Sequence, residues 1–130
     1  DISELRSLEN MERLWIYNNS ISDISALAGM KELSVLYAGM NSIEGISSLA
    51  ELVNLTDVSL HNNAITDVSA LEEHVNLKKL DLSGNPLDDS AVEVLCTLTG
   101  LEKLDLQRTG ISQEGIAAIR AALPKANVLA

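Results

Sequence analysis

The chain has 130 residues and a mass of 14.0 kDa, which is the size of one domain, and it contains no run of about 18 apolar residues that would predict a membrane span. Its formal net charge of −10 disfavours nucleic acids and anionic membranes as partners, because both are themselves negatively charged. The single cysteine, Cys96, excludes an internal disulfide and a cysteine zinc cluster. We therefore expect one domain that binds no nucleic acid and does not insert into a membrane.

A repeated motif of the form LxxLxLxxN organises most of the chain. Successive copies are 22, 22, 22 and 24 residues apart and begin at Met11, Leu33, Leu55, Leu77 and Leu101. The alternation of apolar and polar residues in the centre of each copy predicts a short strand whose leucines point inward. Because one copy cannot bury its own apolar stripe, the copies are expected to stack into a parallel sheet.

The repeats divide the chain into units that are expected to form a single domain, 1–130. These units are a partial repeat at 1–7, repeats at approximately 8–29, 30–51, 52–73, 74–97 and 98–123, and a closing tail at 124–130. The last two repeats have longer return segments, which favour helices. Ser90 and Glu93 form a candidate capping box, and Ser112 precedes apolar residues at helical spacing that end before Pro124.

The five motif copies resemble the leucine-rich repeat family. The first repeats are similar to the 22-residue class of bacterial internalin-like proteins, although Ala26, Ser48 and Ala70 stand where those proteins usually have proline. The last two repeats look like the ribonuclease-inhibitor-like class. The resemblance implies an α/β fold, a right-handed curved solenoid with a parallel sheet on the concave face. It implies short extended or 3-10 turns on the convex face of the early repeats, helices in the last two, and a buried asparagine ladder at Asn19, Asn41, Asn63 and Asn85.

All three aromatic residues fall on outward-facing positions in the first two repeats. Trp15 and Tyr37 occupy the same position on neighbouring strands, so their Cα atoms should lie roughly 4.8 Å apart. Tyr17 faces Gly39, which predicts a dent beside the tyrosine ring. Since Trp and Tyr dominate interface hot spots, we predict an aromatic anchor within a partner-binding face. That face comprises Arg13, Trp15, Tyr17, Val35, Tyr37, Met40, Asp57, Ser59, His61, Lys79, Asp81, Lys103 and Asp105.

Charge is unevenly divided between the two halves of the chain. Residues 1–74 carry 12 acidic and 3 basic side chains, for a net charge of −9, whereas residues 75–130 carry 7 and 6, for −1. The first half is therefore expected to prefer a basic or apolar partner surface, with electrostatic steering that weakens as salt rises. A solvated acidic surface with no partner is the alternative interpretation.

No group of residues predicts a catalytic, metal or cofactor site. Ser59, His61 and Asp81 are close enough along the repeats to suggest a triad, but side chains on a flat sheet diverge into water. The two histidines occupy different settings, so they predict no zinc site. His74 takes a slot that leucine or methionine fills in earlier repeats, and Val75 is expected to provide the packing there.

We predict a module that binds a protein or peptide and catalyses no reaction. Two alternatives remain open: the recognition part of a larger enzyme or effector whose catalytic domain lies outside this chain, and a structural scaffold segment. An apolar edge at Leu5, Leu8, Met11 and Leu14 predicts either upstream residues or end-to-end self-association. The internalin-like resemblance favours a bacterial cell-surface or secreted location over a cytoplasmic one.

Overall fold

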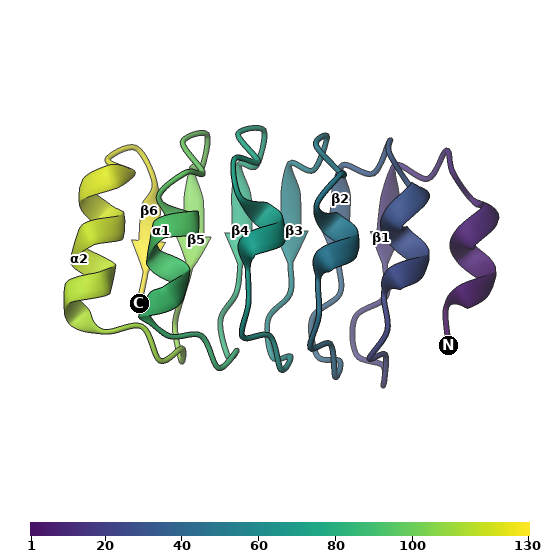
Figure 1. Cartoon of the computed structure of the whole chain (residues 1–130), viewed down its shortest axis with the longest axis horizontal. Helices are drawn as coiled ribbons and strands as arrows, with labels where there is room; N and C mark the ends of the chain where they lie inside the picture. Colours follow the sequence, from purple (N-terminus) through teal and green to yellow (C-terminus); the bar gives the residue numbers. More distant parts are fainter.

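Six short parallel strands form one sheet along the whole length of the molecule (Figure 1). The computed structural model describes all 130 residues. The strands lie side by side in chain order, with the bounds Arg13–Trp15 (β1), Val35–Tyr37 (β2), Asp57–Ser59 (β3), Lys79–Asp81 (β4), Lys103–Asp105 (β5) and Asn127–Leu129 (β6). Each coil therefore pairs only with the coils before and after it, which is the architecture of a solenoid.

The strand register places equivalent motif positions beside one another. Leu14 on β1 pairs with Leu36 on β2, and Lys79 on β4 pairs with Lys103 on β5. Because strand side chains alternate between the two faces, the middle residue of each strand points into the interior. These middle residues are at most 8% exposed: Leu14, Leu36, Val58, Leu80, Leu104 and Val128.

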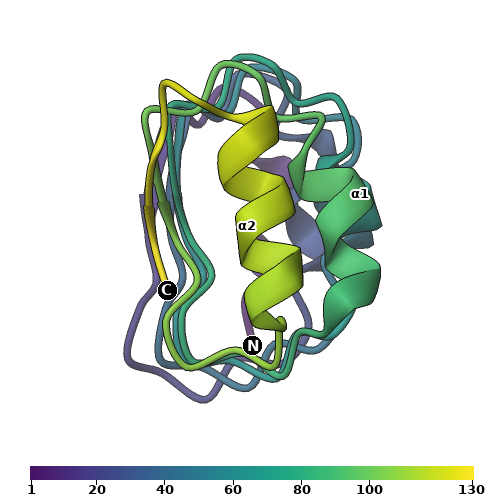
Figure 2. The same cartoon turned by 90° about the vertical axis from the view of Figure 1, so that its left-hand side faces the viewer.

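The interior is a continuous cluster of 32 buried apolar residues. It is built from Leu, Ile, Val, Ala and Met and contains no aromatic side chain. Seen along the solenoid axis, the sheet lies on one side of the coils and the helical segments lie on the other (Figure 2), and both sides contribute residues to this core. All three aromatic rings are thus left outside the core.

The early coils return through 3-10 helices on the side opposite the sheet (Figure 2). Their bounds are Ser3–Ser7 (η1), Ser25–Gly29 (η2), Ser47–Leu49 (η3) and Ser69–Leu71 (η4). The Asp23 carboxylate accepts a hydrogen bond from the Ser25 backbone N–H at 2.8 Å, and Asp67 accepts one from Ser69 at 2.8 Å. These bonds stabilise the charged form and hold the pKa of both carboxyls below the ordinary value.

The last two coils contain more helix than the first three full coils. The helical segments are Asp89–Ala91 (η5), Val92–Leu95 (α1) and Gln113–Ala122 (α2). The predicted cap at Ser90 is wrong, because Asp88 caps this segment by accepting from the Ser90 backbone N–H at 2.9 Å. The segment starts as a 3-10 turn, which moves the cap two residues earlier. The helix predicted after Ser112 is present as α2, and Ser112 caps it, since its Oγ accepts from the Gly115 N–H at 3.0 Å.

The tail that follows α2 returns to the sheet as β6. The helix ends at Ala122, two residues before Pro124, because a proline disfavours helical geometry in the residue before it. Val128 then pairs with Leu104 of β5 and is 6% exposed. The sequence predicted a closing tail but no strand, because the tail lacks the repeat motif.

The opposite end of the sheet has an exposed apolar edge. Leu8 is 43% exposed, whereas its equivalents Met30 and Leu52 in the next two coils are fully buried. The strand β1 has a hydrogen-bonding neighbour on one side only. Of the four residues predicted to form this edge only Leu8 is exposed: Leu5 and Met11 are half-buried against the core and Leu14 is 8% exposed. The apolar edge is therefore smaller than the sequence predicted, and self-association through it stays a prediction.

Candidate functional site

The outward strand residues form one face on the side of the sheet away from the core. Because the register is unbroken, they align in three rows across the strands. The first row holds Arg13, Val35, Asp57, Lys79 and Lys103. The second row holds Trp15, Tyr37, Ser59, Asp81 and Asp105. The third row, two residues further along, holds Tyr17, Gly39, His61, Ser83 and Gln107. The predicted site residues therefore share one surface, with Met40 in the turn just beyond the third row.

Trp15, Tyr17 and Tyr37 form an aromatic patch at the β1–β2 end of this face. Trp15 is 53% exposed and Tyr17 is 56% exposed. The rings of Trp15 and Tyr37 meet edge to face, with centroids 5.8 Å apart and planes inclined by 68°. Such a pair contributes about 0.5–1.5 kcal/mol beyond its buried area, so the two rings hold each other in place without being buried in the core.

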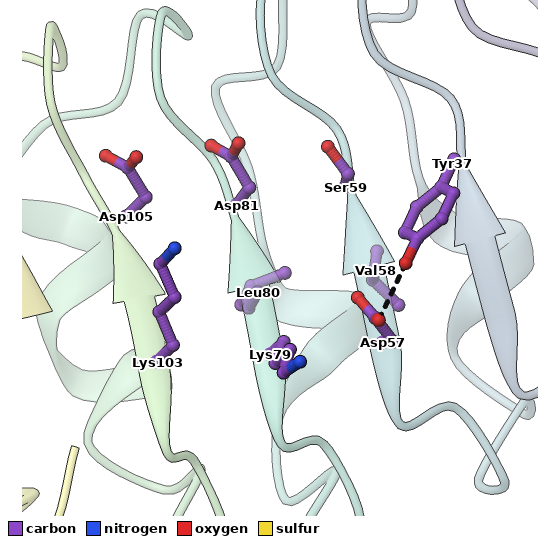
Figure 3. A pocket seen from close by; sticks show the side chains of 9 residues that line it. All are labelled: Tyr37, Asp57, Val58, Ser59, Lys79, Leu80, Asp81, Lys103 and Asp105. Carbon is purple, nitrogen blue, oxygen red and sulfur yellow. Dashed lines mark hydrogen bonds between the residues drawn. The ribbon is translucent and has the colours of Figure 1, made fainter. Parts of the chain in front are cut away.

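Tyr37 is also held by a hydrogen bond that crosses to the next strand. Its hydroxyl donates to Asp57 Oδ2 at 2.8 Å (Figure 3). This bond favours the protonated phenol and, together with partial desolvation and the Asp57 charge, raises the pKa of Tyr37 above its ordinary value. Tyr37 is therefore held by two contacts, one between its ring and the Trp15 ring and one between its hydroxyl and Asp57.

Met40 adds an exposed apolar side chain in a backbone position that does not favour it. The residue just before each ladder position has a positive φ, and it is Asn18, Met40, Asn62, Gly84 or Arg108 in the successive coils. Asn and Gly adopt this left-handed conformation most readily. Met40 has a φ of 57° and is 48% exposed, so neither backbone preference nor core packing accounts for a methionine there.

The dent predicted beside Tyr17 is absent, because the His61 imidazole lies over Gly39. A β-carbon at Gly39 would overlap the ring atoms of His61, so glycine is required for this close approach. The ring is held by a hydrogen bond between its Nδ1 and Ser59 Oγ at 2.8 Å. Sequence reasoning missed this contact because it depends on a side-chain orientation set by the neighbouring coil.

Ser59, His61 and Asp81 lie together, but their geometry is not that of a catalytic triad. Ser59 Oγ and Asp81 Oδ2 both approach the same ring nitrogen, Nδ1, at 2.8 and 3.9 Å. A triad instead needs the nucleophile on one ring nitrogen and the orienting carboxylate on the other. This cluster therefore positions the His61 ring on the face.

A shallow charged groove of about 230 Å³ occupies the rest of the face (Figure 3). It is lined by Tyr37, Asp57, Val58, Ser59, Lys79, Leu80, Asp81, Lys103 and Asp105. Tyr37 belongs both to the aromatic patch and to this groove, so the two surfaces are continuous. On β4 and β5 the first row supplies Lys79 and Lys103 and the second row supplies Asp81 and Asp105, whereas on β3 the first row supplies Asp57.

The predicted asparagine ladder runs along one rim of the sheet. Asn63 is representative: its Nδ2 donates to the carbonyls of Ala38 and Leu60 at 3.0 and 2.9 Å, and its Oδ1 accepts from the Ile43 N–H at 3.0 Å. Asn41 and Asn85 make equivalent contacts with their neighbouring coils.

Asn19 departs from this ladder. It is exposed, and it donates only to the carbonyls of Ile16 and Tyr17 in its own turn, at 3.0 and 3.1 Å. The prediction of a buried amide at this position is wrong, because β1 is the edge strand of the sheet and no strand lies beyond it to supply partners.

His74, which lies away from the sheet face, corrects a second expectation. The imidazole is only 5% exposed, whereas Val75 is 52% exposed, so the histidine fills the leucine slot. Its Nε2 lies 3.0 Å from the Leu49 carbonyl oxygen, which satisfies the buried ring nitrogen. A polar ring can replace leucine here because the neighbouring coil supplies an acceptor.

The rest of the chain presents little site chemistry. No group of three or more His, Cys, Asp or Glu side chains is arranged to hold a metal ion. Cys96 is half-buried, and this burial raises the pKa of its thiol above the ordinary value, which lowers its reactivity. None of the helices combines the length and apolar character that crossing a bilayer would take.

Comparisons with known proteins agree with this architecture. Residues 31–73 match a family model described as leucine rich repeats (2 copies), and residues 73–96 and 98–119 match a second model described as leucine rich repeat. No curated protein matches the chain significantly.

Three solved structures are similar over nearly the whole chain. Internalin C2 from Listeria monocytogenes is 29% identical over 98% of this chain, with a TM-score of 0.83. A leucine-rich repeat protein from Leptospira interrogans is 25% identical over 97%, with a TM-score of 0.86. The internalin inlF from Listeria monocytogenes is 26% identical over 96%, with a TM-score of 0.68. The chain spans 56%, 33% and 42% of the lengths of these three proteins, respectively.

Proposed function

Because this chain belongs to the leucine-rich repeat family, we propose that it is a protein-interaction module that binds a protein or peptide on its sheet face, anchored by the aromatic patch. The proposal rests above all on one observation, the exposure of Trp15 and Tyr17 in a molecule whose core contains no aromatic residue. The core is packed without these rings, which favours a role for them at the surface.

Preorganisation of the patch supports its role as an anchor. An interface side chain that is already immobile loses less conformational entropy on binding. Tyr37 meets this condition, because the Trp15 ring contacts its edge and the Asp57 carboxylate accepts from its hydroxyl at 2.8 Å. Two large rings on few rotatable bonds supply much contact area at low entropic cost.

The surroundings of the patch also favour a binding surface. Val35 and Met40 extend it with further apolar area, and the charged groove begins at Tyr37 itself. Interfaces commonly combine an apolar centre with a polar, charged rim. The sheet face offers both over adjoining strands.

The test is to remove one ring and measure binding. Trp15→Ala is expected to leave the fold intact, by circular dichroism, and to weaken partner binding about 30-fold or more, equivalent to about 2 kcal/mol. The partner is first isolated by photo-crosslinking to the sheet face and purified, and its affinity is then measured by titration calorimetry.

Matched controls lie outside the sheet face. Val53 and Val75 are also apolar and are 57% and 52% exposed. Val53→Ala and Val75→Ala should leave the affinity unchanged. If a folded Trp15→Ala protein bound as tightly as the wild type, the aromatic anchor would be ruled out.

A further inference from the structure

The charged groove contains two like-charge pairs on neighbouring strands. Lys79 on β4 is in register with Lys103 on β5, and Asp81 is in register with Asp105. Strands in a sheet are about 4.8 Å apart, and like charges directly opposite one another destabilise it. The groove thus has a positive pair at one end of these strands and a negative pair two residues further along.

The lysines form no close ion pairs within the molecule. Neither lysine nitrogen lies within 4.0 Å of a carboxylate oxygen; Asp57 is in register beside Lys79, but its Oδ2 accepts from the Tyr37 hydroxyl at 2.8 Å. The closest approach of a basic ring nitrogen to a carboxylate on the face is His61 Nδ1 to Asp81 Oδ2, at 3.9 Å. Lys79 and Lys103 are exposed, and their side chains extend over the sheet surface (Figure 3). The lysine pair therefore carries unpaired positive charge in a strongly acidic chain.

The aspartates are only partly used by the fold. Asp81 Oδ1 accepts from the Ser83 N–H at 3.0 Å, and Asp105 Oδ1 accepts from the Gln107 N–H at 3.0 Å. These bonds fix both carboxylates at the end of their strands. Neither Oδ2 accepts a hydrogen bond, and Asp81 Oδ2 lies 3.9 Å from His61 Nδ1.

The repeat itself does not require these charges. At the same two row positions on β1 and β2 the chain has Arg13 and Val35 in the first row and Trp15 and Tyr37 in the second. The backbone and register are equivalent in both regions, so the residue type at these outward positions is free to serve a ligand.

We propose that the charged groove binds an extended segment of the protein partner with an acidic and a basic side chain two residues apart. The carboxylate sits between Lys79 and Lys103, and the cation sits between Asp81 and Asp105. Same-face residues of an extended segment are about 6.7 Å apart, which matches the row spacing of the groove because both are set by strand geometry. This inference rests on the proposed function of the sheet face.

Electrostatics gives the binding its selectivity. Each charged group of the ligand lies between two groove residues of the opposite charge. It is attracted by both of them and offsets the repulsion between these two residues. A segment with two acidic or two basic residues would satisfy one pair and be repelled by the other. Because the groove is open to solvent, this selectivity should decrease as salt rises.

Random linear peptides displayed on phage provide the test, with the whole chain as bait. Wild-type protein is expected to enrich peptides with an acidic and a basic residue two positions apart. In a bait with K79E and K103E, the four paired positions 79, 81, 103 and 105 are all acidic. The enriched peptides should then change to two basic residues at that spacing. Representative wild-type peptides should bind this variant at least tenfold more weakly in solution.

Two further baits complete the design. Lys31→Glu with Lys125→Glu makes the same change in net charge at exposed sites outside the groove, and it should enrich the same peptides as the wild type. Lys79→Ala with Lys103→Ala tests the groove without adding charge and should reduce selection of the acidic residue. Circular dichroism confirms that each bait is folded.

The outcomes separate this inference from the proposed function. The selected peptides are also titrated against Trp15→Ala. Peptides that bind this variant more weakly but ignore the lysine changes would overturn the groove inference and leave the aromatic anchor standing. Peptides that respond to neither set of substitutions, or a selection with no binders, would count against both.

Discussion

The two ends of the sheet face share a backbone but differ in almost every outward side chain. At β1 and β2 the face presents the aromatic patch, and at β4 and β5 it presents paired lysines and paired aspartates. Strand length and register are the same in both regions. The comparison teaches that in this fold the inward leucines determine the scaffold, and the outward positions can change from apolar to charged without disturbing it.

The two regions also differ in how completely their coils are supported. Strands β4 and β5 each have a paired strand on both sides, whereas β1 pairs only with β2, and the segment before it supplies the 3-10 helix η1 but no strand. Asn85 is 1% exposed, while Asn19, at the same motif position, is exposed. The aromatic end is therefore the less constrained end of the solenoid.

Removing the ladder asparagine at each end of the sheet should change the free energy of unfolding by very different amounts. In the wild type the Asn85 side chain bonds the Ile65 N–H at 3.1 Å and the Leu60 carbonyl at 2.9 Å. Asn85→Ala should destabilise the protein by roughly 1–3 kcal/mol, because it leaves both groups buried without a partner. Asn19→Ala should cost less than about 0.5 kcal/mol, since water can replace its contacts. Urea unfolding of both variants measures this, and equal losses would contradict the comparison.

An intermediate effect separates stability from binding at the two ends. Met40→Asn and Arg108→Asn both place a residue suited to positive φ at positions with φ of 57° and 56°, so each should stabilise the fold by about 0.5 kcal/mol. Only Met40→Asn should weaken binding through the aromatic patch. Thermal unfolding gives the first quantity and partner titration the second. An affinity left unchanged by Met40→Asn would show that Met40 takes no part in binding.

The smallest effect concerns the hydrogen bond from the Tyr37 hydroxyl to Asp57, which joins the aromatic patch to the charged groove. Asp57→Asn should lower the pKa of Tyr37 toward its ordinary value, because the carboxylate that favours the protonated phenol is gone. In the wild type this bond stabilises the folded chain below a pH of about 10, and that contribution is lost as the pH rises through the raised pKa of Tyr37. Ultraviolet absorbance titration checks this, with Tyr17→Phe used to isolate the Tyr37 signal, and an unchanged titration in Asp57→Asn would contradict it.

Much of the sheet face could be predicted because it depends on local periodicity. The register of Trp15 with Tyr37 follows directly from the 22-residue spacing, and their exposure follows from alternation along a strand. The continuity between patch and groove could not be predicted in this way. It depends on the Tyr37 hydroxyl reaching Asp57, and motif spacing does not specify a rotamer.

The sequence by itself determined the number and spacing of the repeats, the inward direction of the leucines, and the gathering of the aromatic residues on one face. Periodicity carries that information, since each position needs only its neighbours along the chain. Tertiary structure decided the ring of His61 over Gly39, the burial of His74 and the exposure of Asn19. The first two depend on a residue of the adjacent coil, 22 to 25 positions away in the sequence. The third depends on the position of β1 at the edge of the sheet.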